Sequence, residues 1–127
     1  MKLFHFGLMP LAAYLALACV VRAETGNAEE GMAVFKQRCA ACHEVEAGVN
    51  KVGPDLRGVW GRTSGTFAGF LYSEAMANAG VIWDEANLTL FLLNPKKFVP
   101  KNKMAFNGLK RPGELEDILE YLKAIKP

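Results

Sequence analysis

Cys39-Ala40-Ala41-Cys42-His43 is the stretch of sequence from which the rest of the chain can be interpreted. Two cysteines are separated by two residues, and a histidine follows the second one directly. Positions i, i+3 and i+4 of a helix lie on one face, so a helical turn would direct both thiols and the imidazole to the same side. The spacing therefore predicts one bound group held by three side chains.

A Cys-x-x-Cys-His sequence is typical of covalent haem c attachment, in which both thiols join the porphyrin and the imidazole binds iron. A structural zinc site would need four sulfur or nitrogen ligands, and beyond residue 23 the chain offers two cysteines and one histidine. A thioredoxin-like pair would need a βαβ context, and a plain disulfide would leave the histidine unexplained. We predict one haem c bound through Cys39 and Cys42, with His43 as an iron ligand.

The first 23 residues have the composition of a signal peptide. Lys2 supplies a positive start, residues 8–18 form an apolar stretch, and Val21-Arg22-Ala23 precedes the expected cleavage site. We therefore expect residues 1–23 to be removed, leaving one domain of residues 24–127.

Two other readings of this N-terminus remain open. Residues 3–21 are nearly long enough to span a bilayer as an uncleaved anchor, although His5 and Pro10 weaken that reading. A lipoprotein cut before Cys19 is the second. We expect an exported, soluble periplasmic protein without a membrane anchor, which agrees with haem attachment outside the cytoplasm.

Net charge argues against nucleic acid as a partner. Of the 15 Lys and Arg residues, Lys2 and Arg22 lie in the leader, so the remaining 13 equal in number the 13 Asp and Glu residues. The basic pI of the whole chain, about 8.5, therefore belongs to the precursor. We predict no nucleic-acid role.

Hydrophobic spacing and capping residues predict helices and no convincing strand. Asn27 followed by Glu30 predicts an N-cap with its return partner, and Gly31 inside the same helix suggests that another helix passes close by. The expected helices run from Asn27 to about Ala41, from Ser73 to Ala79, from Asp84 to Asn94-Pro95 and from Pro112 to Ile125, with a loop over Gly48 to Gly65.

The second iron ligand is predicted by elimination. The other histidine, His5, lies in the leader, so methionine is the available type beyond residue 23. Met32 shares the helix of the haem motif, and Met76 suits an ordinary core role. Met104 lies in a segment without helical period, bounded by Pro100 and Gly108, that can cross a haem face. We predict Met104 as the ligand, which would leave no open position on the iron.

The Gly53-Pro54 pair suggests how the histidine is oriented. A ligating histidine needs a partner for its second ring nitrogen, and a proline carbonyl is a good acceptor. We predict that the Pro54 carbonyl pairs with His43. Taken alone, a Gly-Pro pair is simply a turn.

The ordered motifs resemble class I cytochrome c, the branch of mitochondrial cytochrome c and its soluble bacterial relatives. The resemblance covers residues 28–125 and rests on Cys39-Ala-Ala-Cys42-His43, Gly53-Pro54-Asp55-Leu56-Arg57-Gly58, Trp83, Asn94-Pro95-Lys96-Lys97, Lys103-Met104 and Tyr121-Leu122. It implies an all-α fold with crossing first and last helices, in which Gly31 and Phe35 meet Tyr121 and Leu122.

The resemblance also implies a polar group around a haem propionate, made by Arg62, Tyr72 and Trp83. The chain departs from the family at three places near the ligand. Phe91 stands where tyrosine is usual, Met76 where asparagine is common, and Asn102 where threonine is common. We therefore expect the buried polar network beside Met104 to be partly missing.

A cluster of positive charge surrounds the ligand segment. Between Lys96 and Arg111 there is no acidic residue, and the basic side chains are Lys96, Lys97, Lys101, Lys103, Lys110 and Arg111. An ordinary solvated surface is the simple explanation. The functional one is a surface that docks acidic faces of redox proteins, such as a cytochrome bc-type complex, a terminal oxidase, a reaction centre or a periplasmic dehydrogenase.

These observations predict a monomeric, non-enzymatic one-electron carrier of a respiratory or photosynthetic chain. The alternatives are the haem subunit of a periplasmic dehydrogenase complex, or a peroxidase or gas-binding haem protein if Met104 is not a stable ligand.

Overall fold

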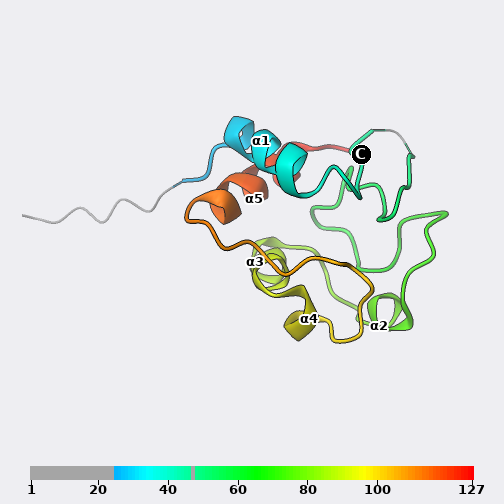
Figure 1. The fold of residues 1–127 in the computed structure, drawn as a ribbon. Helices are drawn as coiled ribbons and strands as arrows, with labels where there is room; N and C mark the ends of the chain where they lie inside the picture. The colour runs from blue at the N-terminus through cyan, green and yellow to red at the C-terminus, as the bar shows by residue number, and fades with distance from the viewer. Residues whose placement is uncertain (1–24, 47) are drawn as a thin grey trace, which may run out of the picture.

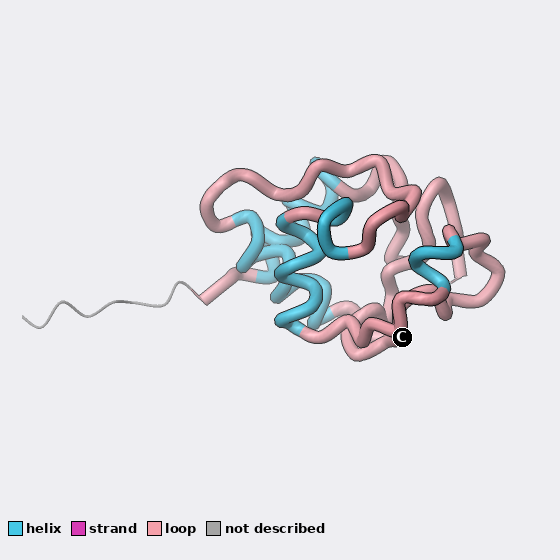
Figure 2. The backbone as a smooth tube through the Cα atoms, turned by 90° about the horizontal axis from the view of Figure 1, so that it is seen from below, coloured by secondary structure: helices cyan, strands magenta, loops and turns pink. Residues whose placement is uncertain are grey.

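The computed structural model describes residues 25–46 and 48–127, so the predicted leader lies outside the described residues. Its helices are α1 (Ala28–Arg38), α2 (Glu74–Ala77), α3 (Glu85–Leu93), α4 (Pro95–Phe98) and α5 (Glu114–Ala124). Figure 1 shows α1 and α5 side by side, with α3 and α4 beneath them and α2 among the loops. Figure 2 shows the helices joined by long loops and no strand in the described ranges. The fold is all-α, as predicted.

The beginning of α1 confirms the predicted cap and corrects its partner. The Asn27 side chain accepts hydrogen bonds from the backbone N–H groups of Glu29 and Glu30. The backbone N–H of Asn27 donates to Asp117 Oδ1 at 2.8 Å, so the return partner comes from α5 and not from Glu30. The expected extension of this helix to about Ala41 is also wrong. α1 ends at Arg38, because the N–H groups of Cys39 and Ala40 converge on the Phe35 carbonyl.

The close approach predicted at Gly31 is present. A Cβ atom there would lie 2.0 Å from the Asp117 carbonyl oxygen and 2.7 Å from Tyr121 Cβ. Phe35 packs on Tyr121 with ring centroids 5.6 Å apart. A glycine is therefore required where α1 meets α5. This contact joins the first and last helices of the described chain.

The middle helices follow their caps. Ser73 accepts from the Met76 N–H and Asp84 from the Asn87 N–H, although α2 ends at Ala77, before the expected Ala79. The short helix α4 was not predicted. Its N-cap is Asn94, whose side chain accepts from the Lys97 N–H at 3.1 Å, and proline occupies its first position.

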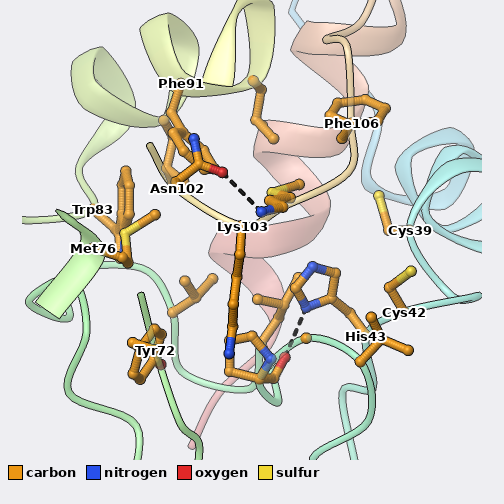
Figure 3. Close-up of a pocket in the computed structure, with 18 of the residues that line it drawn as sticks. Cys39, Cys42, His43, Tyr72, Met76, Trp83, Phe91, Asn102, Lys103 and Phe106 are labelled. Carbon is orange, nitrogen blue, oxygen red and sulfur yellow. Dashed lines mark hydrogen bonds between the residues drawn. The ribbon is translucent and has the colours of Figure 1, made fainter. Parts of the chain in front are cut away.

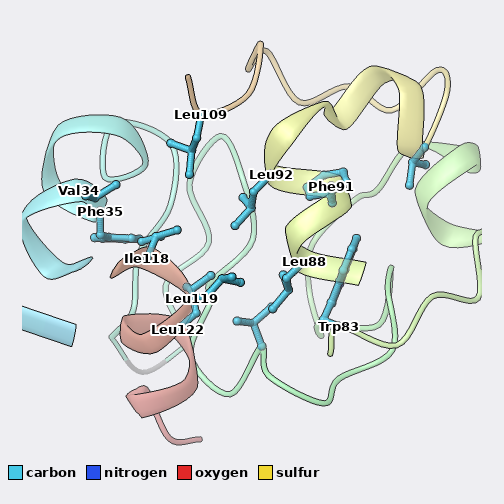
Figure 4. Close-up of a cluster of buried hydrophobic side chains, with 12 residues drawn as sticks. Val34, Phe35, Trp83, Leu88, Phe91, Leu92, Leu109, Ile118, Leu119 and Leu122 are labelled. Atoms are coloured by element: carbon cyan, nitrogen blue, oxygen red, sulfur yellow. The ribbon is translucent and has the colours of Figure 1, made fainter. Parts of the chain in front are cut away.

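Buried apolar side chains from α1, α3 and α5 form one core, which Figure 4 shows. Leu88, Phe91 and Leu92 are the buried residues of α3. Leu90 and Leu93 of the same helix are 54% and 41% exposed. α3 is therefore apolar on its outer side as well. In the part of the chain that the structure describes, no helix is long and apolar enough to cross a membrane.

Candidate haem site

An apolar cavity of about 210 Å³ lies between the loops and the α3–α5 side of the core. Its wall includes every residue that the sequence predicts for the site, namely Cys39, Cys42, His43, Pro54, Arg62, Tyr72, Trp83 and Met104. Figure 3 shows the two cysteines and His43 on one side of this cavity, with Tyr72, Met76 and Trp83 on the other. The fold thus brings together predicted site residues that are spread over positions 39 to 104.

Cys39 and Cys42 lie in helical turns that continue past the end of α1. The N–H groups of Cys42 and His43 both donate to the Cys39 carbonyl, at 3.0 and 2.9 Å. These turns, in place of the expected helix, bring the three side chains to the cavity. Cys39 and Cys42 are both partly buried, and before attachment burial raises the pKa of the Cys39 thiol to about 11.

The predicted partner of His43 is confirmed. His43 is 7% exposed, and its Nδ1 lies 2.8 Å from the Pro54 carbonyl oxygen. Since that oxygen can only accept, Nδ1 carries the proton and Nε2 has a free lone pair. Figure 3 shows the second ring nitrogen of His43 turned away from the dashed hydrogen bond. Burial lowers the pKa of His43, which favours the neutral imidazole that a metal requires.

Gly53 also lies against the His43 ring. A Cβ atom at Gly53 would lie 2.3 Å from His43 Cε1 and 2.6 Å from Nδ1. Backbone therefore packs directly on the imidazole. The sequence indicated only a turn at Gly53. It gave no sign that Gly53 contacts His43, which lies ten positions earlier.

Lys51 ties the attachment turns to the same loop. Its Nζ donates to the Ala40 carbonyl at 2.8 Å and to Glu44 Oε1 at 3.0 Å. Sequence reasoning missed this residue, because a lone lysine in a loop carries no periodic signal. Its charge is compensated by Glu44, which distinguishes it from the lysines near Met104.

Arg62, Tyr72 and Trp83 all line the cavity. The Arg62 guanidinium donates to the carbonyls of Asp55 and Arg57, both at 3.1 Å. The Tyr72 hydroxyl accepts from the Phe67 N–H at 3.3 Å, and burial raises the pKa of Tyr72. Trp83 is 7% exposed and packs against Phe91, with ring centroids 4.9 Å apart.

The structure reduces the number of methionines that could serve as the iron ligand. Met104 and Met76 both line the cavity, whereas Met32 is not among its lining residues and is 37% exposed. Met76 belongs to α2, and Met104 to the helix-free segment between α4 and α5.

Asn102 is a residue near Met104 that sequence reasoning undervalued. It is 5% exposed, and both ends of its side-chain amide are hydrogen-bonded. The polar network expected to be partly missing is therefore supplied at this position, while Phe91 and Met76 contribute apolar wall.

The family described as Cytochrome c matches residues 28–126, which is most of the chain. The chain belongs to the cytochrome c family. It is 48% identical over 101 residues to cytochrome c of Euglena viridis, covering 80% of this chain and 99% of that protein. Against cytochrome c2 iso-2 of Magnetospirillum molischianum it is 51% identical over 88 residues, covering 69% of this chain and 91% of the relative. Cytochrome c 2.1 of Caenorhabditis elegans is 50% identical over 98 residues, with coverages of 77% and 88%.

The cavity fits the cofactor of this cytochrome family. Two thiols three positions apart meet one apolar space, and a neutral imidazole faces it with a free ring nitrogen. The cofactor is accordingly one haem c, with Cys39 and Cys42 at the covalent attachment spacing.

Proposed function

We propose that this cytochrome is a periplasmic carrier that accepts and gives up one electron at a time between redox complexes of a respiratory or photosynthetic chain. Electron transport as such follows from the family. The periplasmic setting is supported by the sequence of the leader and by the bacterial cytochrome c2 relative. The haem iron supplies the one-electron couple when it is bound.

We propose that His43 and Met104 would hold the haem iron. Pro54 and Gly53 orient His43, and its Nε2 is the ring nitrogen left for iron. Met104 lies on a helix-free segment that lines the same cavity, which suits a thioether that must reach across a flat group. With both positions filled, small molecules have no access to the metal. This closed site is the single feature on which the carrier function rests.

The remaining wall supports a carrier more than a catalyst. Arg62, Tyr72 and Trp83, which all line the cavity, are the proposed partners of a haem propionate. Among the described residues no carboxylate lines the cavity, and the only histidine there is His43 itself. A peroxidase needs an acid or base on the reactive face, which this wall does not supply.

Spectra of the holoprotein test the closed site. We expect the oxidised protein to show a sulfur-to-iron absorption band and the reduced protein to bind no carbon monoxide. Met104→Ala should remove the band and admit carbon monoxide, and Met76→Leu should do neither. Ready carbon monoxide uptake by the unaltered protein would favour the gas-binding or peroxidase alternative. Loss of the band in Met76→Leu alone would assign the ligand to Met76.

We further propose that Lys96, Lys97, Lys101, Lys103 and Lys110 form a docking surface for acidic partners. All five are exposed, and none forms an ion pair with a carboxylate in the described part of the chain. The Lys103 ammonium crosses to the Leu71 carbonyl and the Phe70 ring, so positive charge reaches the cavity mouth. Uncompensated charge of this kind accelerates encounter with an acidic surface.

Salt dependence tests the docking surface. With a purified acidic redox partner, the bimolecular electron-transfer rate should fall as ionic strength rises. Lys97→Glu should slow the reaction at low salt, whereas Lys36→Glu, the same charge change on α1, should have a much smaller effect. A rate independent of salt would refute this docking surface and leave the haem site untouched. The same rates measured with a purified dehydrogenase complex would distinguish a dedicated subunit from a diffusing carrier.

A further inference from the structure

We infer that Asn102 is a positioning residue for Met104, because its side chain fastens the segment that carries the methionine to α4. This inference rests on the proposed function, since it takes Met104 as the iron ligand. Asn102 would act through Met104 and would touch neither the partner protein nor the metal.

The Asn102 amide is bonded at both ends. Its Nδ2 donates to the carbonyls of Pro95 and Val99, both at 2.8 Å, and its Oδ1 accepts from the Met104 N–H at 2.9 Å. Figure 3 shows this last bond as a dashed line beside the cavity. The amide therefore spans from the end of α4 to the backbone of the ligand residue.

The backbone of Asn102 is held to the same helix. Its carbonyl accepts from Lys96 Nζ at 2.6 Å, and its N–H donates to the Val99 carbonyl at 3.2 Å. The side chain is also 5% exposed, so water cannot readily replace these partners. Removing the amide would leave the Met104 N–H without its acceptor, and the Pro95 and Val99 carbonyls would each keep only a backbone N–H donor.

The turn before Asn102 explains why such fastening is needed. Residues 99–102 form a β-turn in which Lys101 has φ of 65°. This left-handed position favours glycine or asparagine, and a lysine there is strained. The backbone at Lys101 therefore disfavours this conformation of the Met104 segment. The hydrogen bonds of the Asn102 side chain compensate for that strain.

A buried asparagine could also stabilise the fold without any special effect on Met104. The two roles differ in how local their effects are. If Asn102 positions Met104, its loss lets the methionine leave the iron while the rest of the protein stays folded. If Asn102 only contributes to overall stability, any substitution with a similar cost elsewhere has the same effect.

Imidazole binding to the oxidised holoprotein separates these roles, because imidazole must displace the methionine. Binding is followed by loss of the sulfur-to-iron band. We expect Asn102→Ala to bind imidazole about tenfold more tightly, as loss of one buried hydrogen bond predicts. Asn102→Ser should lie in between, because a hydroxyl can still accept from the N–H two residues on. The control Asn27→Ala removes the α1 cap, and its imidazole affinity should match that of the unaltered protein.

The outcomes separate the inference from the function on which it rests. Equal imidazole affinities for Asn102→Ala and Asn27→Ala would overturn the positioning role. If Met104→Ala kept the sulfur-to-iron band, the proposed ligand would fail first. If Asn102→Ala does not fold, amide hydrogen exchange in Asn102→Ser tests the positioning role instead. The Met104 N–H should exchange faster there than in Asn27→Ala, and equal exchange in the two would refute the inference.

Discussion

Asp117 accepts a 2.8 Å hydrogen bond from the backbone N–H of Asn27, which lies 90 positions away in the sequence. Asn27 in turn caps α1 with its own side chain. The N-terminus of α1 is thus satisfied partly by its own residue and partly by α5. Next to it, a Cβ at Gly26 would lie 2.0 Å from the Glu116 carbonyl oxygen, so the chain enters α1 directly against α5.

Asp117→Ala should lower the free energy of unfolding by about 1–2 kcal/mol, because a charged acceptor is removed from a helix end. Denaturant titration of the holoprotein measures this. Glu116→Ala is the matched control, since the neighbouring carboxylate is exposed, and it should change stability by less than about 0.5 kcal/mol. Equal effects of the two substitutions would show that the long-range bond contributes nothing.

Gly31→Ala should destabilise the protein by roughly 1–3 kcal/mol, since the new Cβ would meet backbone atoms that cannot move aside. For a domain of this size each kcal/mol lowers Tm by about 4–8 °C. Calorimetry measures the shift. Lys36→Ala, on an exposed position of α1, should leave Tm nearly unchanged. An unaltered Tm in Gly31→Ala would mean that α1 and α5 are farther apart than described.

Gly53→Ala should displace the His43 ring, because the added Cβ would lie 2.3 Å from Cε1. We expect a weakened bond to Pro54, an altered visible spectrum and lower stability. Gly61→Ala is the comparison, since a Cβ there meets no atom within 4 Å and costs only the strain of its φ of 81°. A perturbed spectrum is expected in Gly53→Ala alone, and identical spectra would contradict the contact.

Lys101→Gly should change the Met104 segment in the opposite direction to Asn102→Ala. Glycine removes the strain of the left-handed conformation, and this gain of about 1 kcal/mol exceeds its added flexibility in the unfolded chain. Imidazole should therefore bind more weakly than in the unaltered protein. Lys101→Ala, which keeps a Cβ and loses the same charge, controls for charge and should bind imidazole as the unaltered protein does. Equal affinities for the glycine and alanine variants would exclude backbone strain as the cause.

Local sequence signals predicted the features that depend on neighbouring residues. The Asn27, Ser73 and Asp84 caps are present, and the Pro54 carbonyl pairs with His43. In each case a backbone N–H or a ring nitrogen needs a hydrogen-bond partner that lies nearby in the sequence. Residue type and spacing were therefore enough to predict these bonds.

Several features that depend on distant or aperiodic residues were missed. Asp117 replaces Glu30 as partner of the Asn27 N–H because tertiary packing brings α5 within hydrogen-bond distance of the start of α1. The four residues of α4 are too few to show a helical period. Asn102 was noted only as a departure from the family, since nothing in a single sequence shows that an asparagine will bond in two directions.

The exposed leucines of α3 affect how the protein behaves in concentrated solution. Leu90 and Leu93 are 54% and 41% exposed on the helix that precedes the α4 lysines, and Lys110 Nζ donates to the Leu93 carbonyl. Mutual repulsion between these ammonium groups keeps the leucines of two molecules apart at low salt. Screening removes that protection, so reversible clustering should begin in the salt range where docking weakens. Light scattering recorded alongside the electron-transfer rates would separate clustering from the loss of docking.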